Sequence, residues 1–293
     1  MAPPEAPAAP PPQGGAPSGP PKPVPRLPAN GAPIVRWPAE AIWEQISPLL
    51  PGFTVEVLPQ IDSTNSELMR RARAGPIEPT LLVAESQTAG RGRLGRQWSS
   101  EAGGSLTFSL GLALAPQDWS GLSLAVGVAV ADSLHPDIRI KWPNDLWLDG
   151  RKLAGILVET VAVDGASPAT RNAVVGIGIN IAPRAADGLS TPPAWLQELV
   201  PGITASQALQ RIALPLVQAL QGFADHGFGV FAERYAARDL LQGRTVTLSD
   251  GQRGTAHGVS ASGALLVHTA AGMQQITSSE VSVRPGNAPA GGA

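Results

Sequence analysis

A short basic, glycine-rich segment is the most informative stretch of the sequence. Three arginines and three glycines fall within the seven positions from Gly90 to Arg96. Glycine lets a backbone approach a ligand and expose its N–H groups, and arginine offers a planar fork to a carboxylate or a phosphate. Residues 87–100 have no apolar period and are expected to form a loop. From composition alone, a loop that closes on an anionic ligand and a solvated basic loop are about equally favoured.

A proline turn at 140–146 gathers a second group of polar side chains. Pro143 bends the chain between two short strands, so Lys141, Asn144 and Asp145 are presented together. Asn can hydrogen-bond the edge of a base, and Asp can hold Mg²⁺ through oxygen. Because Pro-Asn-Asp also makes a good turn unaided, this motif alone favours a structural role.

Three further segments combine polar groups with room against a sheet. Lys152 opens an apolar strand that continues through Gly155, where a missing side chain leaves space. In 176–180 glycine alternates with isoleucine, so one face of that strand can accept a flat ligand and Asn180 can supply hydrogen bonds. Residues 61–65 indicate a helix N-cap, and the same hydroxyls can also meet a small polar ligand.

Composition excludes several other chemistries. The 293-residue chain has no cysteine, which excludes a disulfide scaffold, a thiolate zinc site and a catalytic cysteine. Its 43% hydrophobic residues suffice for a core, and its net charge of -2 gives no support to a sequence-independent nucleic-acid coat protein. No run of 18 apolar residues and no signal peptide is found, so a cytoplasmic protein is expected.

Periodicity predicts the elements that must position these motifs. A catalytic domain is expected over 34–241 and a small β-domain over 242–285, between disordered tails at 1–33 and 286–293. Of the 30 prolines, 13 lie in the first 33 residues. Thr64 and Glu67 have capping-box spacing. Helices are expected at 39–50, 64–74, 122–134, 204–223 and 230–241. Strands are expected at 54–58, 80–86, 105–112, 138–142, 146–148, 153–163 and 173–181, and then at 244–249, 254–259, 264–268 and 273–277.

Together, the five motifs resemble those of bacterial biotin protein ligases in order and spacing. The resemblance covers about 53–285 and implies an α/β (α+β) catalytic domain with a mixed sheet, distantly like class II aminoacyl-tRNA synthetases. It also implies a C-terminal SH3-like β-barrel. The motifs that carry it are Asp62–Asn65, Gln87 with Gly90–Gly95 and Trp98, Lys141–Asp145, Arg151–Gly155, and Gly176–Asn180.

The resemblance also implies a reaction and its residues. Biotin would attack the α-phosphate of Mg·ATP to give biotinyl-5′-AMP, and a lysine of the biotin carboxyl carrier protein of acetyl-CoA carboxylase would then displace AMP. The implied catalytic residues are Lys152, Arg91, Arg93 and Asp145, with Mg²⁺ near Asp145 and its other ligands unknown. The implied biotin contacts are Ser63, Thr64, Asn65, Gln87, Arg91, Gly92, Arg93 and Lys152. The implied ATP contacts are Arg93, Trp98, Lys141, Asn144, Lys152 and Asn180.

Two alternative functions and several partners follow from the same resemblance. Some family members carry an N-terminal DNA-binding module, but residues 1–52 offer a Pro/Ala tail and one helix, so neither a DNA nor a membrane partner is expected. A homodimer through the sheet edge stays open. One alternative is a lipoate or octanoate ligase or transferase of the same fold, against which the Gly-Arg-Gly-Arg-Xaa-Gly run argues. The other is a non-catalytic, biotin-responsive regulatory protein, against which Arg91, Arg93 and Lys152 argue.

Overall fold

The computed structural model describes residues 35–75, 77–163, 165, 167, 169–183, 191–277 and 284–285. The tails expected at 1–33 and 286–293 lie outside these ranges. Within them, none of the helices is long and apolar enough to cross a membrane.

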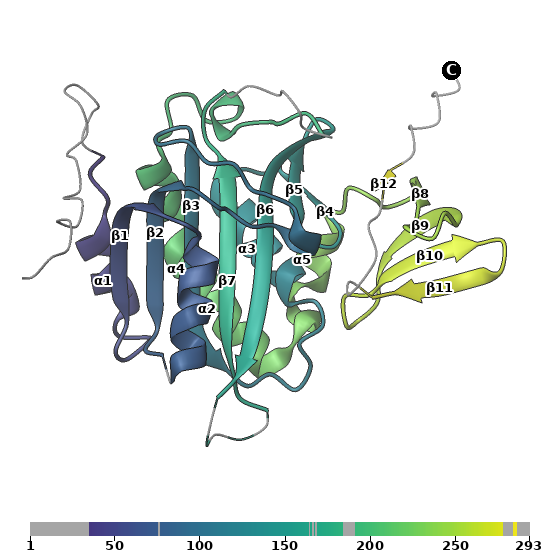
Figure 1. Ribbon diagram of the computed structural model, residues 1–293. Coiled ribbons are helices and arrows are strands. Elements are labelled where there is room, and N and C mark those ends of the chain that lie inside the picture. Colours follow the sequence, from purple (N-terminus) through teal and green to yellow (C-terminus); the bar gives the residue numbers. More distant parts are fainter. Residues whose placement is uncertain are drawn as a thin grey trace, which may run out of the picture. The chain divides into compact units, whose positions relative to one another are not determined.

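A seven-stranded mixed sheet forms the centre of the catalytic domain, as expected (Figure 1). The strand order is β1-β2-β3-β7-β6-β5-β4, in which β1 and β2 are parallel and the other neighbours are antiparallel. The β5–β6 pairing reaches only to Gly155 of β6, so β6 continues beyond the end of β5. The strands are β1 (Thr54–Ile61), β2 (Thr80–Gln87), β3 (Ser105–Leu114), β4 (Arg139–Lys141), β5 (Asp145–Leu148), β6 (Arg151–Ala162) and β7 (Arg171–Asn180).

Helices cover both faces of this sheet, and they do so unequally. One face carries α2 (Thr64–Ala74), which buries Leu68 and Met69 in a small cluster with the sheet. The other face carries α3 (Leu122–Leu134) and α4 (Ala205–His226), and Figure 1 shows the two layers. Because α3 packs against both the sheet and α4, almost all of its side chains are apolar and buried. The main core therefore lies on the α3–α4 side, and α1 (Ala39–Ile46) adds to it.

The C-terminal region forms a separate antiparallel sheet in the order β11-β10-β9-β8-β12. Its hairpin turns fall where the sequence predicts them, with positive φ at Gly251, Gly263 and Gly272. Trp142 Nε1 donates a 3.1 Å hydrogen bond to the carbonyl of Gly263, which ties this sheet to the β4–β5 turn. No β11–β12 pair is seen among the described residues, so closure into an SH3-like barrel stays a prediction. The strands are β8 (Thr245–Thr247), β9 (Arg253–Val259), β10 (Leu265–Thr269), β11 (Gly272–Ile276) and β12 (Arg284–Pro285).

Two local expectations are wrong. The helix expected at 230–241 is only α5 (Ala232–Ala236), because the chain then turns so that the Arg238 carbonyl and the Leu240 N–H pair with Ile140. The capping box of Thr64 and Glu67 is absent, because Ser63 is the N-cap and its hydroxyl accepts from the N–H three residues on. The Glu67 carboxylate instead pairs with Arg70 and Arg71 one turn further along α2.

A pH-dependent effect on stability is expected at Asp239, where the chain leaves α5. Burial raises the pKa of the Asp239 carboxyl group above its usual value, and hydrogen bonds from Leu241 N–H and Tyr235 oppose the shift. A carboxyl group whose pKa is raised on folding destabilises the protein as pH rises from its unfolded pKa, about 4, through its folded pKa. We therefore expect Asp239→Asn to increase the free energy of unfolding at pH 7.5 and to have little effect at pH 4.

Urea unfolding of the two proteins at both pH values measures this difference. The exposed Asp225→Asn is the matched control and should change stability by less than about 0.5 kcal/mol at either pH. An equal effect of Asp239→Asn at pH 4 and pH 7.5 would rule the explanation out.

Candidate active site

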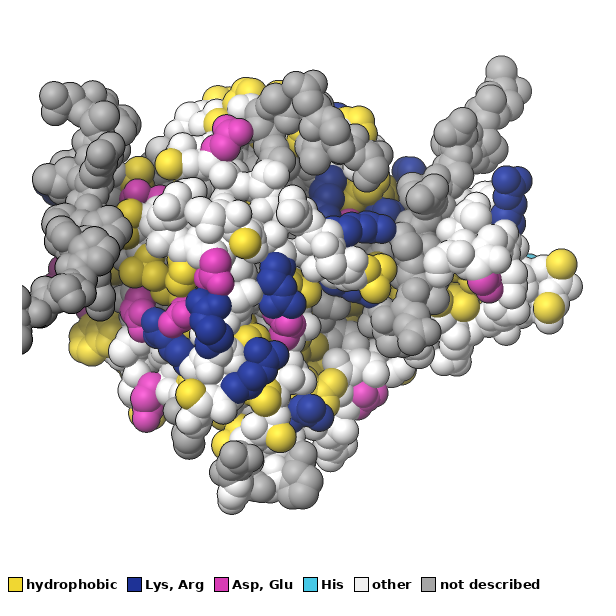
Figure 2. All heavy atoms as spheres, viewed as in Figure 1, with side chains coloured by type: hydrophobic (Ala, Val, Ile, Leu, Met, Phe, Trp, Pro, Cys, Tyr) yellow, Lys and Arg dark blue, Asp and Glu magenta, His cyan; other side chains and the backbone are white. Residues whose placement is uncertain are grey.

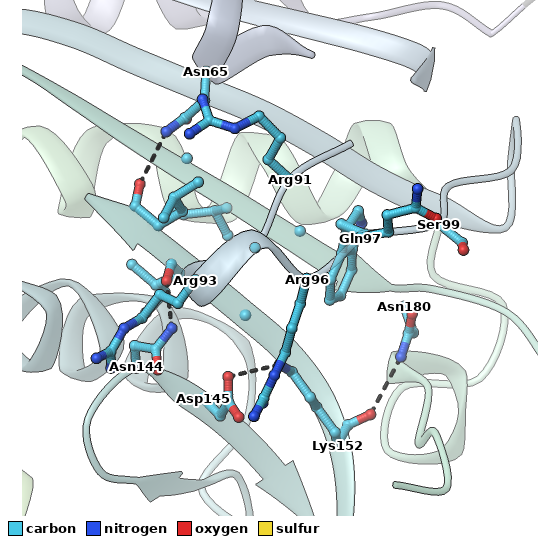
Figure 3. A pocket seen from close by; sticks show the side chains of 18 of the residues that line it. Asn65, Arg91, Arg93, Arg96, Gln97, Ser99, Asn144, Asp145, Lys152 and Asn180 are labelled. Carbon is cyan, nitrogen blue, oxygen red and sulfur yellow. Dashed lines mark hydrogen bonds and ion pairs between the residues drawn. The ribbon is translucent and has the colours of Figure 1, made fainter. Parts of the chain in front are cut away.

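All the side chains that the sequence selects line one cavity of about 250 Å³. The cavity lies against β6 and β7, and it is bordered by the 88–100 loop, the start of α2 and the β4–β5 turn (Figure 3). Placement in one cavity agrees with the expected site, while the individual roles stay predictions. The predicted residues that line it are Ser63, Thr64, Asn65, Gln87, Arg91, Gly92, Arg93, Trp98, Lys141, Asn144, Asp145, Lys152 and Asn180.

The start of α2 supplies a buried polar end to the cavity. The Thr64 N–H and hydroxyl both donate to Gln87 Oε1, at 2.7 and 3.2 Å. Ser109 Oγ on β3 lies 2.7 Å from both Thr64 Oγ1 and Asn65 Oδ1. The Asn65 amide nitrogen donates to Glu159 Oε2 at 3.0 Å. These groups are held in a network within a largely apolar sheet, so they can exchange partners with a small polar ligand at little cost in reorganisation.

Ser109 and Glu159 were missed by sequence reasoning. Glu159 accepts two hydrogen bonds from Arg91, at 2.8 and 3.1 Å, and so fastens the 88–100 loop to β6. Neither residue belongs to a recognisable motif, because each is a single polar position in an otherwise apolar strand. That position was the available signal, since a polar side chain in such a strand needs a partner.

The reactive side of the cavity is built on the β5–β6 hairpin. Lys152 Nζ lies 2.7 Å from Asp145 Oδ1 (Figure 3). Asp145 is paired with Gly155 across the two strands, and a Cβ at Gly155 would lie only 3.3 Å from Lys152 Nζ. The register and the glycine together let the ammonium group lie close to the sheet beside the carboxylate, so both can meet a ligand there.

The Lys152 backbone is fixed by a segment that sequence reasoning left unassigned. Lys152 donates its N–H to the carbonyl of Pro192, and its carbonyl accepts from the Ala194 N–H. Asn180 donates its side-chain amide to the carbonyls of Lys152 and Ala194, at 3.2 and 3.0 Å. Asn180 therefore holds β6 and this segment side by side, which positions Lys152.

Arg93 and Asn144 form the neighbouring part of the wall. Arg93 Nη1 donates to Asn144 Oδ1 at 3.3 Å, and the Asn144 amide donates to the carbonyl of Ile156. Burial lowers the pKa of the Arg93 guanidinium, and the negative charge of Asp145 partly offsets that effect. Since arginine stays protonated at neutral pH, the site holds a partly desolvated cation, which an incoming anion would stabilise.

The glycine face of β7 is present, but it is not open as expected. The indole of Trp98 lies on Gly178, where an added Cβ would collide with the ring, and Asn65 lies on Gly176 in the same way. The missing side chains therefore accommodate the protein's own Trp98 and Asn65. The Trp98 Nε1 is buried and has no acceptor within the described ranges.

The donor set fits a magnesium ion that arrives with a nucleotide. Among the described residues, no group of three or more His, Asp or Glu side chains could hold a metal. Asp145 is the one carboxylate among the described lining residues. Mg²⁺ commonly takes one or two carboxylate oxygens and completes its octahedron with substrate phosphates and water. Asp145 can serve as that ligand only by loosening its contact with Lys152.

Comparison with known proteins places these features in a family. Residues 57–180 match the Biotin/lipoate A/B protein ligase family, and residues 243–284 match the Biotin protein ligase C terminal domain. The chain is 35% identical over 253 residues to the bifunctional ligase/repressor BirA of Escherichia coli, covering 82% of this chain and 77% of that protein. It is 33% identical to the biotin–[acetyl-CoA-carboxylase] ligase of Paracoccus denitrificans, covering 77% of this chain and 98% of that protein.

A solved structure resembles this chain over a similar extent. The biotin protein ligase from Aquifex aeolicus in complex with biotin and ATP superimposes with a TM-score of 0.66 at 28% sequence identity. The match covers 79% of this chain and 99% of that one.

The contact between Trp98 and Gly178 predicts how the loop responds to a single methyl group. Gly178→Ala should displace the indole and loosen the 88–100 loop, because the ring rests on that glycine. We expect trypsin to cleave after Arg91, Arg93 or Arg96 roughly 10-fold faster, which corresponds to about 1.4 kcal/mol less resistance to local opening.

Two comparisons isolate this effect. Gly222→Ala on α4, where no atom lies within 4 Å of an added Cβ, should leave the cleavage rate unchanged. In a Trp98→Ala background, Gly178→Ala should add nothing further. Equal acceleration with and without the indole would show that the contact does not hold the loop.

Proposed function

The chain belongs to the biotin protein ligase family, and we propose that it activates biotin with Mg·ATP and transfers the biotinyl group to a lysine of a carrier protein. In the first step a biotin carboxylate oxygen bonds to the α-phosphorus, and the bond to the β-phosphate bridging oxygen breaks, which releases pyrophosphate. In the second step the lysine ε-amine attacks the mixed anhydride, AMP leaves with the electron pair, and the amine loses a proton.

The observation that carries this proposal is the meeting of cations with a buried polar end in one cavity. Lys152 and Arg93 line the cavity that Thr64, Asn65 and Gln87 also line. An anionic carboxylate approaches an anionic phosphate only where positive charge offsets their repulsion, and fixed cations in a partly desolvated site do this effectively. The polar end suits the uncharged, hydrogen-bonding part of biotin.

The pairing of Lys152 with Asp145 suggests an exchange of partners on ligand binding. Without ligand, each neutralises the other at 2.7 Å. In the proposed reaction Lys152 turns to the biotin carboxylate and the α-phosphate. Asp145 is then released to contact the magnesium of Mg·ATP or to orient the incoming amine. The exchange explains how the protein keeps a lysine charged in this cavity before substrate arrives.

The Arg91–Glu159 ion pair supports a loop that can shield the intermediate. Two parallel hydrogen bonds fasten Arg91 to β6, while Arg93 lies two residues further along the same loop. A closed loop would exclude water from the reactive anhydride, which otherwise hydrolyses. Gly92 lies between these arginines and lines the cavity, where a side chain would stand between loop and ligand.

The acceptor is proposed to be the biotin carboxyl carrier protein of acetyl-CoA carboxylase. Support comes from the name of the Paracoccus relative, which the chain matches over almost that protein's whole length. The family model over 57–180 also includes lipoate ligases, so lipoate or octanoate stays the alternative substrate. A non-catalytic regulatory protein is less well supported, because the proposed catalytic cations all line the cavity.

Pyrophosphate release tests the activity and the substrate together. The purified full-length chain is incubated with Mg·ATP and biotin, lipoate or octanoate, and pyrophosphate is measured in each case. Biotin-dependent release is expected. Release with lipoate alone would assign the chain to lipoate activation, and no release with any acid would favour the regulatory alternative.

Loss of the Lys152 ammonium group should impair the first step specifically. We expect Lys152→Ala to slow biotin-dependent pyrophosphate release by about 10²-fold or more, the scale of losing one oriented electrostatic donor. Arg151→Gln is the matched control, because the neighbouring Arg151 pairs with Glu198 and does not line the cavity. The control should retain activity within about two-fold, as for most surface changes. Adenylation at the wild-type rate in Lys152→Ala would reject the assignment.

A further inference from the structure

A second cavity, of about 470 Å³, adjoins the proposed active site. It runs along β6 from Ile156 to Thr160, beyond the end of β5, and beside the start of α3. Arg93, Asn144 and Ile156 line both cavities, so the Arg93–Asn144 contact is part of the boundary between them. An anion that leaves the main cavity past Arg93 would enter this second cavity.

The lining of the second cavity suits an anion. It contains two arginines, Arg93 and Arg171, together with hydroxyls of Ser120 and Thr160, and none of its described lining residues is acidic. The Arg171 Nε is buried, and its hydrogen has no acceptor among the described residues. A buried N–H of a cation without an acceptor is costly, and a ligand oxygen would remove that cost.

The direction of the proposed displacement leads toward this cavity. In phosphoryl and nucleotidyl transfer the attacking and leaving oxygens lie roughly in line on opposite sides of phosphorus. The carboxylate would be held beside Lys152 and Asp145, and Figure 3 shows Arg93 and Asn144 to one side of that pair. The leaving group would then depart past Arg93, toward Arg171.

We propose that the second cavity binds the β- and γ-phosphates of ATP and the pyrophosphate that they become, with Arg171 as a binding residue for this group. The inference rests on the proposed function and deepens it. The bond between the α-phosphorus and its bridging oxygen breaks, and its electron pair leaves on pyrophosphate between Arg93 and Arg171. Arg171 does not line the main cavity, so it binds the polyphosphate without contacting biotin.

The reverse reaction tests this assignment directly. The enzyme is supplied with biotinyl-5′-AMP and magnesium pyrophosphate, and formation of ATP is measured. We expect Arg171→Gln to raise the KM for pyrophosphate about 10-fold, the scale of one lost charge-assisted hydrogen bond, with the KM for biotin in the forward direction unchanged. Arg171→Lys keeps the charge without the fork and should lie between the two.

The exposed Arg211→Gln on α4 controls for the loss of one positive charge from the chain and should behave as wild type. An unchanged KM for pyrophosphate in Arg171→Gln would overturn the proposal, and so would an equal rise in the KM values for pyrophosphate and biotin. Inorganic phosphate, as a second inhibitor, should compete more weakly than pyrophosphate. Equal competition would show a site for any single phosphate.

Failure of the proposed function would be seen separately. If the wild type releases no pyrophosphate with any acid, calorimetric titration of the wild type and Arg171→Gln with magnesium pyrophosphate still decides the site. Weaker binding to the variant supports a polyphosphate site in that case. Equal binding, or binding to neither, overturns it while leaving open what the main cavity does.

Discussion

Repulsion between two anions is the constraint on which the arrangement of this site depends. A carboxylate and a polyphosphate must come within bonding distance, and water must be excluded from their product. The protein answers with Lys152 on a rigid hairpin and Arg93 on a loop, so positive charge reaches the meeting point from two directions. The hairpin provides fixed geometry, and the loop provides a group that can close after the ligands have entered.

The sheet makes this arrangement possible by leaving out side chains. Glycines on β6 and β7 let the Lys152 side chain, the Trp98 ring and Asn65 lie against the strands. The loop is therefore already seated on the surface that its ligand shares. A loop seated in this way loses less conformational entropy on closing than a free loop would, so more of the binding free energy is available to hold the reactive groups together.

Much of the fold could be predicted because its strands and helices have clear periods, and their limits fall within a few residues of expectation. The helix expected at 230–241 fails because its sequence pattern cannot reveal that Arg238 and Leu240 pair with Ile140 about 100 residues away. The site residues were predictable where they form motifs. Ser109 and Glu159 were not, because each acts as a single polar position whose partners come from distant segments. The seating of Trp98 on Gly178 was missed for the same reason.

Arg93 shows why such a site is held together by its ligands as much as by its fold. Its guanidinium is partly desolvated, and its printed partner is the uncharged Asn144, so burial lowers the pKa of this group. A cation in that position is unfavourable for the protein alone and becomes favourable when phosphate oxygens replace the lost hydration. The same interaction is stronger with the doubly bridged, highly charged polyphosphate than with biotin. Nucleotide binding is therefore the step that should draw the Arg93 segment fully onto the sheet, after biotin has entered beneath it.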